Sequence, residues 1–210
     1  MQDTPESKWE DEYMKKFDRT TLDNKYGIVF GTNNLVYIKT GNGGNIYGYE
    51  NKYQKIANRI NDELGYAVLV AANPVEEQCN LHSEMENVFD TFGIYNAFDD
   101  IIYIGFSDGA NIGAQQGYLI PEIKRMLLIN GPLMINFHKT KRGICAFENE
   151  KIEMVYGKQD PSYKYVELLD SIDSRILLVN TLENIDHNFT NALPEFEQLI
   201  FGFVNEFQRK

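Results

Sequence analysis

Short, wholly apolar runs alternate with longer amphipathic runs along most of this sequence. The short runs are typical of strands that are buried on both faces. The longer runs carry apolar residues three and four positions apart, which is typical of helices. The sequence predicts strands at residues 26–30, 35–38, 66–71, 101–104, 125–129, 152–156 and 176–179. It predicts helices at residues 49–64, 81–98, 110–118, 163–172 and 191–207.

The order of these elements predicts the fold class. A turn at 31–34 separates the first two strands, and strand and helix then alternate without a break. Strands that are apolar on both faces need helices on each side of their sheet. We therefore expect an α/β protein with a doubly wound, mostly parallel β-sheet flanked by helices on both faces. Residues 1–210 are expected to form one domain, with residues 1–20 as a polar, surface-packed or frayed helical arm.

Composition narrows the class of partner. The chain has 210 residues, of which 43% are hydrophobic, and this is enough for one well-buried core. Its formal net charge of −11 repels polyphosphates and anionic lipid surfaces, so neither nucleic acid nor a membrane is expected as a partner. The sequence lacks a secretory signal and any apolar run long enough to span a bilayer, so the expected location is the cytoplasm.

The two cysteines, Cys79 and Cys145, form no CxxC motif. Two cysteines in a chain of this size favour free thiols in a reducing compartment over a disulfide scaffold. A single disulfide between them stays open as the alternative.

The segment 105–109 reads Gly-Phe-Ser-Asp-Gly, and it follows a predicted strand and opens a helix of small residues. In this context G-x-S-x-G indicates a nucleophile elbow, a strained turn that projects the hydroxyl of Ser107 beyond the sheet. We expect side chains at the two glycine positions to collide with neighbouring strands. A bare match arises by chance in a chain with 16 glycines, and the strand-turn-helix context distinguishes this one. Gly113, one turn further on, favours close packing of the helix on the sheet.

A serine nucleophile needs a base, and the chain offers three histidines for that role. Ligands of doubly wound sheets bind beyond the carboxyl ends of strands, so the base should follow a strand. His187 follows the last predicted strand and precedes the last helix, as expected for the base. His82 precedes the serine and His138 precedes any credible acid, which favours ordinary surface or loop positions for both.

The base in turn needs a carboxylate that orients it. Asp160 follows the strand predicted at 152–156, and the interval from Asp160 to His187 holds one helix and one strand. Asp160 also fits the N-cap of the next helix, with Pro161 as the first helical residue, and both roles are compatible. Asp186 is the rival acid, but its adjacency to His187 points its side chain away from the imidazole too readily.

A glycine-rich loop, Thr-Gly-Asn-Gly-Gly-Asn at residues 40–45, follows the strand predicted at 35–38. Such a loop lets backbone N–H groups point inward without obstruction by side chains, as an oxyanion hole requires. The alternatives are a phosphate-binding loop and a plain flexible turn. The loop lacks both the G-K-[ST] of a Walker motif and the G-x-G-x-x-G of a dinucleotide site, which disfavours nucleotide binding.

From about Tyr26 onward the chain resembles the α/β-hydrolase superfamily. The loop at 40–45, the elbow at 105–109 and the two turns that hold Asp160 and His187 carry the resemblance. The resemblance implies that the backbone N–H groups of Asn42 and Asp108 are the oxyanion donors. The expected catalytic side chains are Ser107, Asp160 and His187. This chain departs from the common pattern of the superfamily at Thr40, where many members carry histidine.

The interval between the strands predicted at 125–129 and 152–156 is short. Members with a large lid commonly insert it there, so this chain resembles the small, cap-less esterases, thioesterases and acyl-peptide-type hydrolases. The resemblance implies an open site.

The expected activity is hydrolysis of a small ester or thioester through an acyl-enzyme on Ser107. The expected partner is a small-molecule acyl substrate, and no cofactor or metal is expected. A serine peptidase and a non-catalytic binding protein of the same fold are the alternatives, and a complete triad disfavours the second. The candidate substrate-binding residues, chosen from their positions after strands, are Gly43, Tyr47, Asn73, His82 and Met134.

Overall fold

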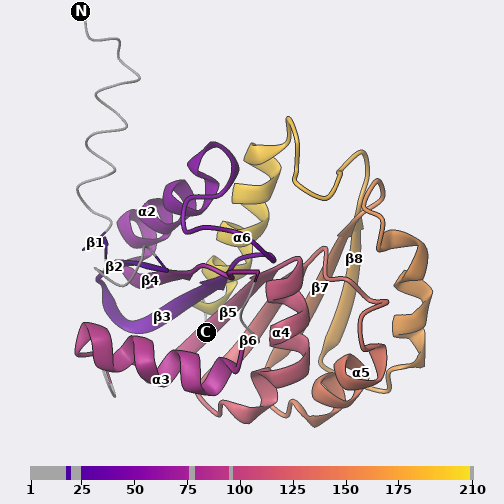
Figure 1. The fold of residues 1–210 in the computed structure, drawn as a ribbon, viewed down its shortest axis with the longest axis horizontal. Helices are drawn as coiled ribbons and strands as arrows, with labels where there is room; N and C mark the ends of the chain where they lie inside the picture. The colour runs from indigo at the N-terminus through magenta and orange to yellow at the C-terminus, as the bar shows by residue number, and fades with distance from the viewer. Residues whose placement is uncertain (1–17, 20–24, 76–78, 95–96, 209–210) are drawn as a thin grey trace, which may run out of the picture.

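The structure is a computed structural model that describes residues 18–19, 25–75, 79–94 and 97–208. Its sheet has the strand order β1-β2-β4-β3-β5-β6-β7-β8 (Figure 1). Strands β3 to β8 are parallel to one another, whereas β2 runs antiparallel to its neighbours β1 and β4. The strands are β1 (Asp18–Arg19), β2 (Tyr26–Val29), β3 (Thr32–Lys39), β4 (Tyr66–Ala71), β5 (Asp100–Phe106), β6 (Ile123–Ile129), β7 (Lys151–Gly157) and β8 (Leu177–Leu182).

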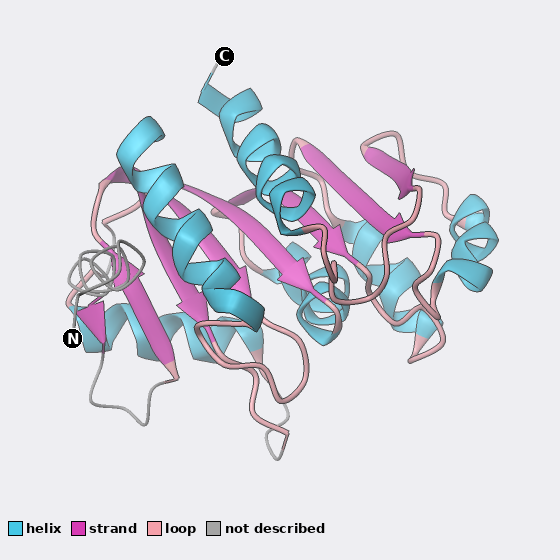
Figure 2. Ribbon diagram, turned by 90° about the horizontal axis from the view of Figure 1, so that it is seen from above, coloured by secondary structure: helices cyan, strands magenta, loops and turns pink. Residues whose placement is uncertain are grey.

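Helices cover both faces of this sheet (Figure 2). The α-helices are α2 (Lys52–Leu64), α3 (Leu81–Phe92), α4 (Asp108–Gln116), α5 (Phe137–Ala146) and α6 (Leu193–Gln208). Shorter 3-10 segments are η1 (Tyr49–Asn51), η2 (Gly117–Leu119) and η3 (Tyr163–Ser171). Helices α2 and α6 pack on one face, and α3, α4 and α5 pack on the other.

The alternation of side chains along β3 shows how one strand serves both cores. Val36 and Ile38 join the apolar cluster under α2 and α6, whereas Leu35 and Tyr37 join the cluster under α3 and α4. All four are at most 1% exposed. Successive side chains of a strand point to opposite faces, so a wholly apolar strand is buried between two helical layers. The predicted fold class, a doubly wound and mostly parallel sheet with helices on both faces, is confirmed.

The first two predicted strands, β2 and β3, are not neighbours in the sheet. β4 lies between them, pairing antiparallel with β2 and parallel with β3. The connection therefore passes over the end of β4, and a Cβ atom at Gly31 would lie 2.4 Å from the backbone nitrogen of Ala67. The connection also ends earlier than predicted, because β3 already begins at Thr32.

Helix α5 has no counterpart among the predicted elements. It forms the crossover between β6 and β7, and its sequence mixes Lys139, Lys141 and Arg142 with few apolar residues. Gly143 lies where α5 meets α4, and a Cβ atom there would stand 2.1 Å from the carbonyl oxygen of Ala114. The buried face of α5 is Thr140, Gly143 and Ile144, so small or polar residues occupy most of the stripe that large apolar residues usually mark in a surface helix.

Other predicted elements differ at their ends. The helix predicted at 81–98 ends at Phe92, because Gly93 adopts the left-handed conformation, with φ of 64°. The segment predicted as a helix at 163–172 is the 3-10 segment η3. Within the predicted arm at 1–20, Asp18 and Arg19 form strand β1, and its other residues lie outside the described residues.

Both cysteines are free thiols, Cys79 half-buried and Cys145 exposed. Burial raises the pKa of the Cys79 thiol to about 12. Among the described residues, none of the helices combines the length and the apolar character that crossing a bilayer requires.

The close approach of α4 to the sheet at Gly113 yields a stability prediction. A Cβ atom at Gly113 would lie 2.3 Å from Cε1 of the buried Tyr103 ring. We expect Gly113→Ala to lower the free energy of unfolding by about 1–3 kcal/mol through overpacking. Gly202→Ala is the matched control, because nothing lies within 4 Å of its added Cβ atom. In helix α6 that change should be neutral or stabilise by up to about 1 kcal/mol. Equilibrium unfolding in urea measures both, and a Gly113→Ala protein as stable as the parent would contradict the packing account.

Candidate active site

Ser107 occupies the turn between β5 and α4 with φ of 54° and ψ of −119°, a conformation that non-glycine residues rarely adopt. Its backbone N–H donates to the carbonyl of Ile129 at 2.8 Å, and its carbonyl accepts from Ala110 at 2.9 Å. The sheet therefore holds one side of the peptide and the helix holds the other. Strain of this kind persists only where the surroundings over-determine it, and it clusters at functional sites.

The two glycines that flank Ser107 leave room for backbone atoms. A Cβ atom at Gly109 would lie 2.2 Å from the carbonyl oxygen of Lys39, at the end of β3. A Cβ atom at Gly105 would lie 2.5 Å from the carbonyl oxygen of Gly109. The expected collision with a neighbouring strand therefore occurs at Gly109, whereas Gly105 is required by the start of α4.

Ser107, His187 and Asp160 lie in a hydrogen-bonded line. His187 Nε2 is 3.1 Å from Ser107 Oγ, and His187 Nδ1 contacts Asp160 Oδ2. The Asp160 side chain is fully buried, whereas the His187 side chain is 38% exposed. The imidazole therefore stands between an inaccessible carboxylate and an accessible hydroxyl.

Asp160 also serves its own turn. Its Oδ1 accepts the backbone N–H of Ser162 at 2.6 Å, while its Oδ2 faces His187. The predicted N-cap role is wrong, because η3 begins at Tyr163 with Ser162 as its N-cap. Asp160 instead closes the turn before η3 with one carboxylate oxygen and faces His187 with the other.

Asp186, the rival acid, is engaged within its own turn. Its Oδ1 accepts the backbone N–H groups of Thr190 at 2.8 Å and Asn188 at 3.1 Å. These backbone hydrogen bonds, that from Thr190 first, lower the pKa of the Asp186 carboxyl. Asp186 thus shapes the turn that carries His187, while Asp160 contacts the imidazole.

Asn130 is a site residue that sequence reasoning missed. It follows β6, is fully buried and has φ of 50°. Its Nδ2 donates to the carbonyl of His187 at 3.0 Å, and its Oδ1 accepts the backbone N–H of Gly157 at 2.9 Å. One side chain therefore ties the turn of Asp160 to the turn of His187. The signal in the sequence was an asparagine directly after a buried strand, a residue type that tolerates the left-handed conformation.

The glycine-rich loop passes directly beside Ser107. A Cβ atom at Gly41 would lie 2.9 Å from Ser107 Cβ and 3.4 Å from its Oγ. The backbone N–H groups of Asn42 and Asp108 donate to no group in the part of the chain that the structure describes. That both N–H groups bind an oxygen atom next to Ser107 stays a prediction.

A buried ammonium group lies beneath the site. Lys52 is 3% exposed, and its Nζ lies 4.0 Å from the ring centre of Phe106 and 4.4 Å from that of Phe196. The Phe106 ring in turn lies 5.4 Å from the His187 imidazole. Burial lowers the pKa of Lys52 to about 8, against the opposing effect of the Asp186 carboxylate.

The candidate substrate-binding residues lie in different places. Gly43 belongs to the glycine-rich loop beside Ser107, Tyr47 lies between that loop and η1, and Met134 is exposed in the connection after β6. Asn73 is 3% exposed and hydrogen-bonded, so it lines no open surface. Whether Gly43, Tyr47 and Met134 contact a substrate stays a prediction.

His82 lies away from the Ser107 site, contrary to its selection as a pocket residue. It is in α3, with Nδ1 3.3 Å from Glu86, and it lines a separate pocket of 150 Å³ together with Phe98 and Ile101. Ile101 lies at the amino end of β5, whereas Ser107 follows the carboxyl end. The reason is where α3 begins: the backbone N–H of Leu81, next to His82, donates to Oε1 of Gln116, at the end of α4 that is remote from Ser107. No three His, Cys, Asp or Glu side chains gather as metal ligands within the described residues.

Comparison with solved structures defines the class of fold. Est1E from Butyrivibrio proteoclasticus is similar with a TM-score of 0.72 and 14% sequence identity, over 93% of this chain and 100% of that one. The esterase Pf2001 of Pyrococcus furiosus is similar with a TM-score of 0.64 and 14% identity, over 98% of this chain and 96% of that one. An α/β serine hydrolase homologue from Coxiella burnetii is similar with a TM-score of 0.63 and 18% identity, over 88% of this chain and 94% of that one.

The fold is that of the α/β hydrolases, as the motifs of the sequence predicted. No protein-family model and no curated protein matches the sequence itself. At these identities the likeness concerns the fold alone, because one fold can carry sites of different chemistry.

Proposed function

We propose that this protein is a serine hydrolase that cleaves a small carboxylic ester or thioester through an acyl-enzyme. The observation that carries the proposal is the hydrogen-bonded line from Ser107 through His187 to Asp160, which starts from a strained turn at the end of β5. A hydroxyl next to an imidazole that a carboxylate orients is the arrangement that activates serine as a nucleophile.

Acylation starts with attack of Ser107 Oγ on the carbonyl carbon of the substrate. His187 Nε2 takes the hydroxyl proton, and Asp160 stabilises the resulting imidazolium. The carbonyl oxygen becomes an oxyanion and accepts hydrogen bonds from the backbone N–H groups of Asn42 and Asp108. The tetrahedral intermediate then collapses, and His187 returns the proton to the departing alcohol or thiol.

Deacylation repeats these steps with water as the nucleophile. His187 takes a proton from the water while the water oxygen adds to the acyl carbon. Collapse of the second tetrahedral intermediate breaks the bond to Ser107 Oγ, which regains its proton from His187, and the carboxylic acid leaves. The chemistry of this cycle is supplied by side chains and backbone groups of the chain itself.

The connection between β6 and β7 forms no lid over the proposed site. The connection between β6 and β7 forms α5, which packs on α4 through Gly143. It is therefore part of the helical layer and not a lid over His187, whose side chain is 38% exposed. The names of the similar structures, which are esterases and hydrolases, favour an ester over a peptide as the substrate.

Replacement of the nucleophile tests the proposal. We expect Ser107→Ala to lose labelling by a fluorophosphonate and to lose hydrolysis of p-nitrophenyl acetate, because no oxygen remains to form the acyl bond. The residual rate should be about 10³–10⁴-fold over water, from binding and oxyanion stabilisation alone. Its thermal melt should match the parent, because the change removes one half-buried oxygen atom. Undiminished hydrolysis by Ser107→Ala would reduce Ser107 to a turn residue and favour the non-catalytic binding protein.

The two aspartates near the base make a matched pair of variants. Asp160→Asn should lower kcat heavily, by up to about 10⁴-fold, because an amide stabilises neither the correct histidine tautomer nor the imidazolium. Asp186→Asn should have a much smaller effect, because Asp186 contacts backbone N–H groups of its own turn. Steady-state kinetics on p-nitrophenyl acetate compares them. A larger loss in Asp186→Asn would show that Asp186 is the acid.

A further inference from the structure

Asn73 is the second residue after β4 and is 3% exposed. Its backbone forms a two-way bridge with the glycine-rich loop. The Asn73 carbonyl accepts the N–H of Gly43 at 2.7 Å, and the Asn73 N–H donates to the carbonyl of Gly44 at 3.1 Å. These two bonds hold the loop immediately after Asn42, one of the two proposed oxyanion donors.

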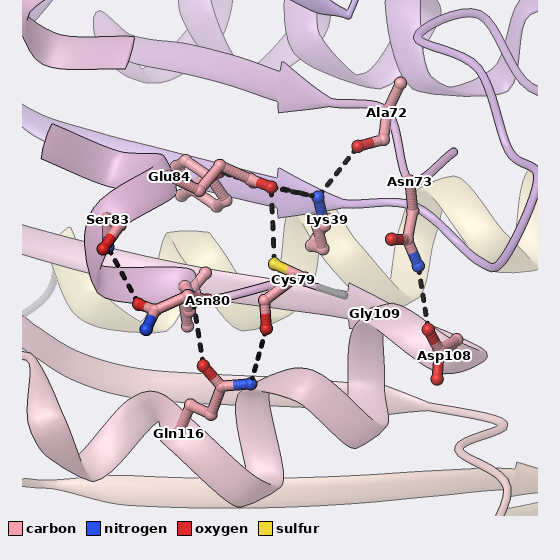
Figure 3. A network of polar contacts seen from close by, with 12 residues as sticks. Lys39, Ala72, Asn73, Cys79, Asn80, Ser83, Glu84, Asp108, Gly109 and Gln116 are labelled. Carbon is pink, nitrogen blue, oxygen red and sulfur yellow. Dashed lines mark hydrogen bonds and ion pairs between the residues drawn. The ribbon is translucent and has the colours of Figure 1, made fainter. Parts of the chain in front are cut away.

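The side chain of Asn73 reaches the other proposed donor. Its Nδ2 donates to Asp108 Oδ2 at 2.9 Å, as Figure 3 shows. Asp108 is the residue after the nucleophile, and its backbone N–H opens helix α4. Asn73 therefore contacts both segments that carry a proposed oxyanion donor, and its amide is the side-chain link between them.

An ion pair between Lys39 and Glu84 contacts the residue that precedes Asn73 in the chain (Figure 3). Lys39 at the end of β3 is 1% exposed, and its Nζ lies 2.6 Å from a carboxylate oxygen of Glu84 in α3. The same Nζ donates to the carbonyl of Ala72 at 2.8 Å, the residue before Asn73. The ends of β3 and β4, from which the glycine-rich loop and Asn73 depart, are thus tied together.

The cost of this arrangement points to a role in geometry. Desolvation of a buried ion pair offsets most of its attraction, so such a pair is weak evidence for stability on its own. Oxyanion stabilisation, in contrast, depends on donors that are held in place before the reaction, and a displacement of about 1 Å costs about 10²-fold in rate. The contacts of Lys39 fix the ends of β3 and β4. The glycine-rich loop and the segment with Asn73 start from these two ends.

We infer that Asn73 is the positioning residue of the oxyanion hole, setting the N–H of Asn42 through its backbone and the N–H of Asp108 through its amide. This inference rests on the proposed hydrolase function. Asn73 touches neither substrate nor the reacting atoms. It acts by fixing the relative position of two donors that come from different strands.

The first test truncates the amide. Asn73→Ala keeps both backbone bonds to the loop and removes the link to Asp108. We expect kcat and kcat/KM on p-nitrophenyl acetate to fall together by about 10²-fold, as for an interaction made only in the transition state. Asn58→Ala is the matched control, because Asn58 is fully buried in α2 and its side chain has no partner among the described residues. Its kcat should stay within about twofold of the parent.

A transition-state analogue reads the oxyanion hole without turnover. Ser107 Oγ adds to the carbonyl carbon of an aliphatic trifluoromethyl ketone, His187 takes the proton, and the ketone oxygen becomes the hemiketal oxyanion. The inhibition constant should rise in Asn73→Ala by the same factor as kcat/KM falls, since both report the transition state. A general loss of structure in the variant would instead lower the melting temperature, and the rise in the inhibition constant would not match the fall in kcat/KM.

A swap of the two partners provides the rescue. Asn73→Asp alone sets two carboxylates against each other and should lose as much activity as Asn73→Ala. Adding Asp108→Asn restores one amide-carboxylate hydrogen bond with donor and acceptor exchanged, and it should recover at least about tenfold of the lost kcat. The swap also carries the test if Asn73→Ala melts below the assay temperature.

The outcomes separate the two levels of the proposal. A folded Asn73→Ala protein with the parent's kcat and inhibition constant overturns the role of Asn73, and so does a folded swap without recovery. Both results leave the hydrolase function standing, because the parent is then active and labelled by fluorophosphonate. A parent protein that is neither active nor labelled overturns the proposed function and, with it, this inference.

Discussion

Around Ser107, backbone atoms of β3, β5 and α4 meet at distances that leave no room for side chains. The carbonyl of Lys39 lies where a Cβ atom of Gly109 would be, and α4 lies where a Cβ atom of Gly105 would be. Ser107, between the two glycines, has a positive φ of 54° with ψ of −119°, and its hydroxyl oxygen lies 3.1 Å from His187 Nε2. The positions of the imidazole and the glycine-rich loop matter chemically only because this turn fixes the oxygen between them.

Polar side chains buried under the loops hold the rest of the site. Asn130 joins the turns of Asp160 and His187, and Asn73 joins the glycine-rich loop to the residue after Ser107. Each of these asparagines follows a strand at the carboxyl edge of the sheet. A loop that departs from a strand has few ladder bonds of its own, so a buried amide with two donors and an acceptor is an effective substitute.

The strands and most helices were predictable because burial on two faces leaves a plain apolar pattern, as in Tyr66–Ala71. The strand order was not, because the position of β4 between β2 and β3 depends on contacts that the local pattern does not encode. Helix α5 was not predicted, because its buried face includes Thr140 and Gly143, which give no apolar signal, and Gly143 packs on the carbonyl of Ala114. In both cases packing between elements outweighs the local signal.

The candidate site divides in the same way. The hydrogen-bonded line of Ser107, His187 and Asp160 could be anticipated, because each residue follows a predicted strand and the chemistry of a candidate triad restricts the residue types. Their supports, Asn73 and Asn130, were not assigned these roles, because hydrogen bonds between distant loops leave no spacing in the sequence. His82 was misplaced because a position after a strand does not say where the next helix begins, and α3 begins beside Gln116, at the end of α4 that is remote from Ser107.

The central claim is that a covalent acyl-enzyme forms on Ser107, and its direct measurement is the mass of the protein during turnover. Rapid acid quenching of a reaction with p-nitrophenyl acetate, followed by intact mass and peptide mapping, locates any acyl group. The account predicts one acetyl group per chain, on the peptide that contains Ser107. Steady hydrolysis with no acetyl group on that peptide, or with the group on another residue, would contradict it.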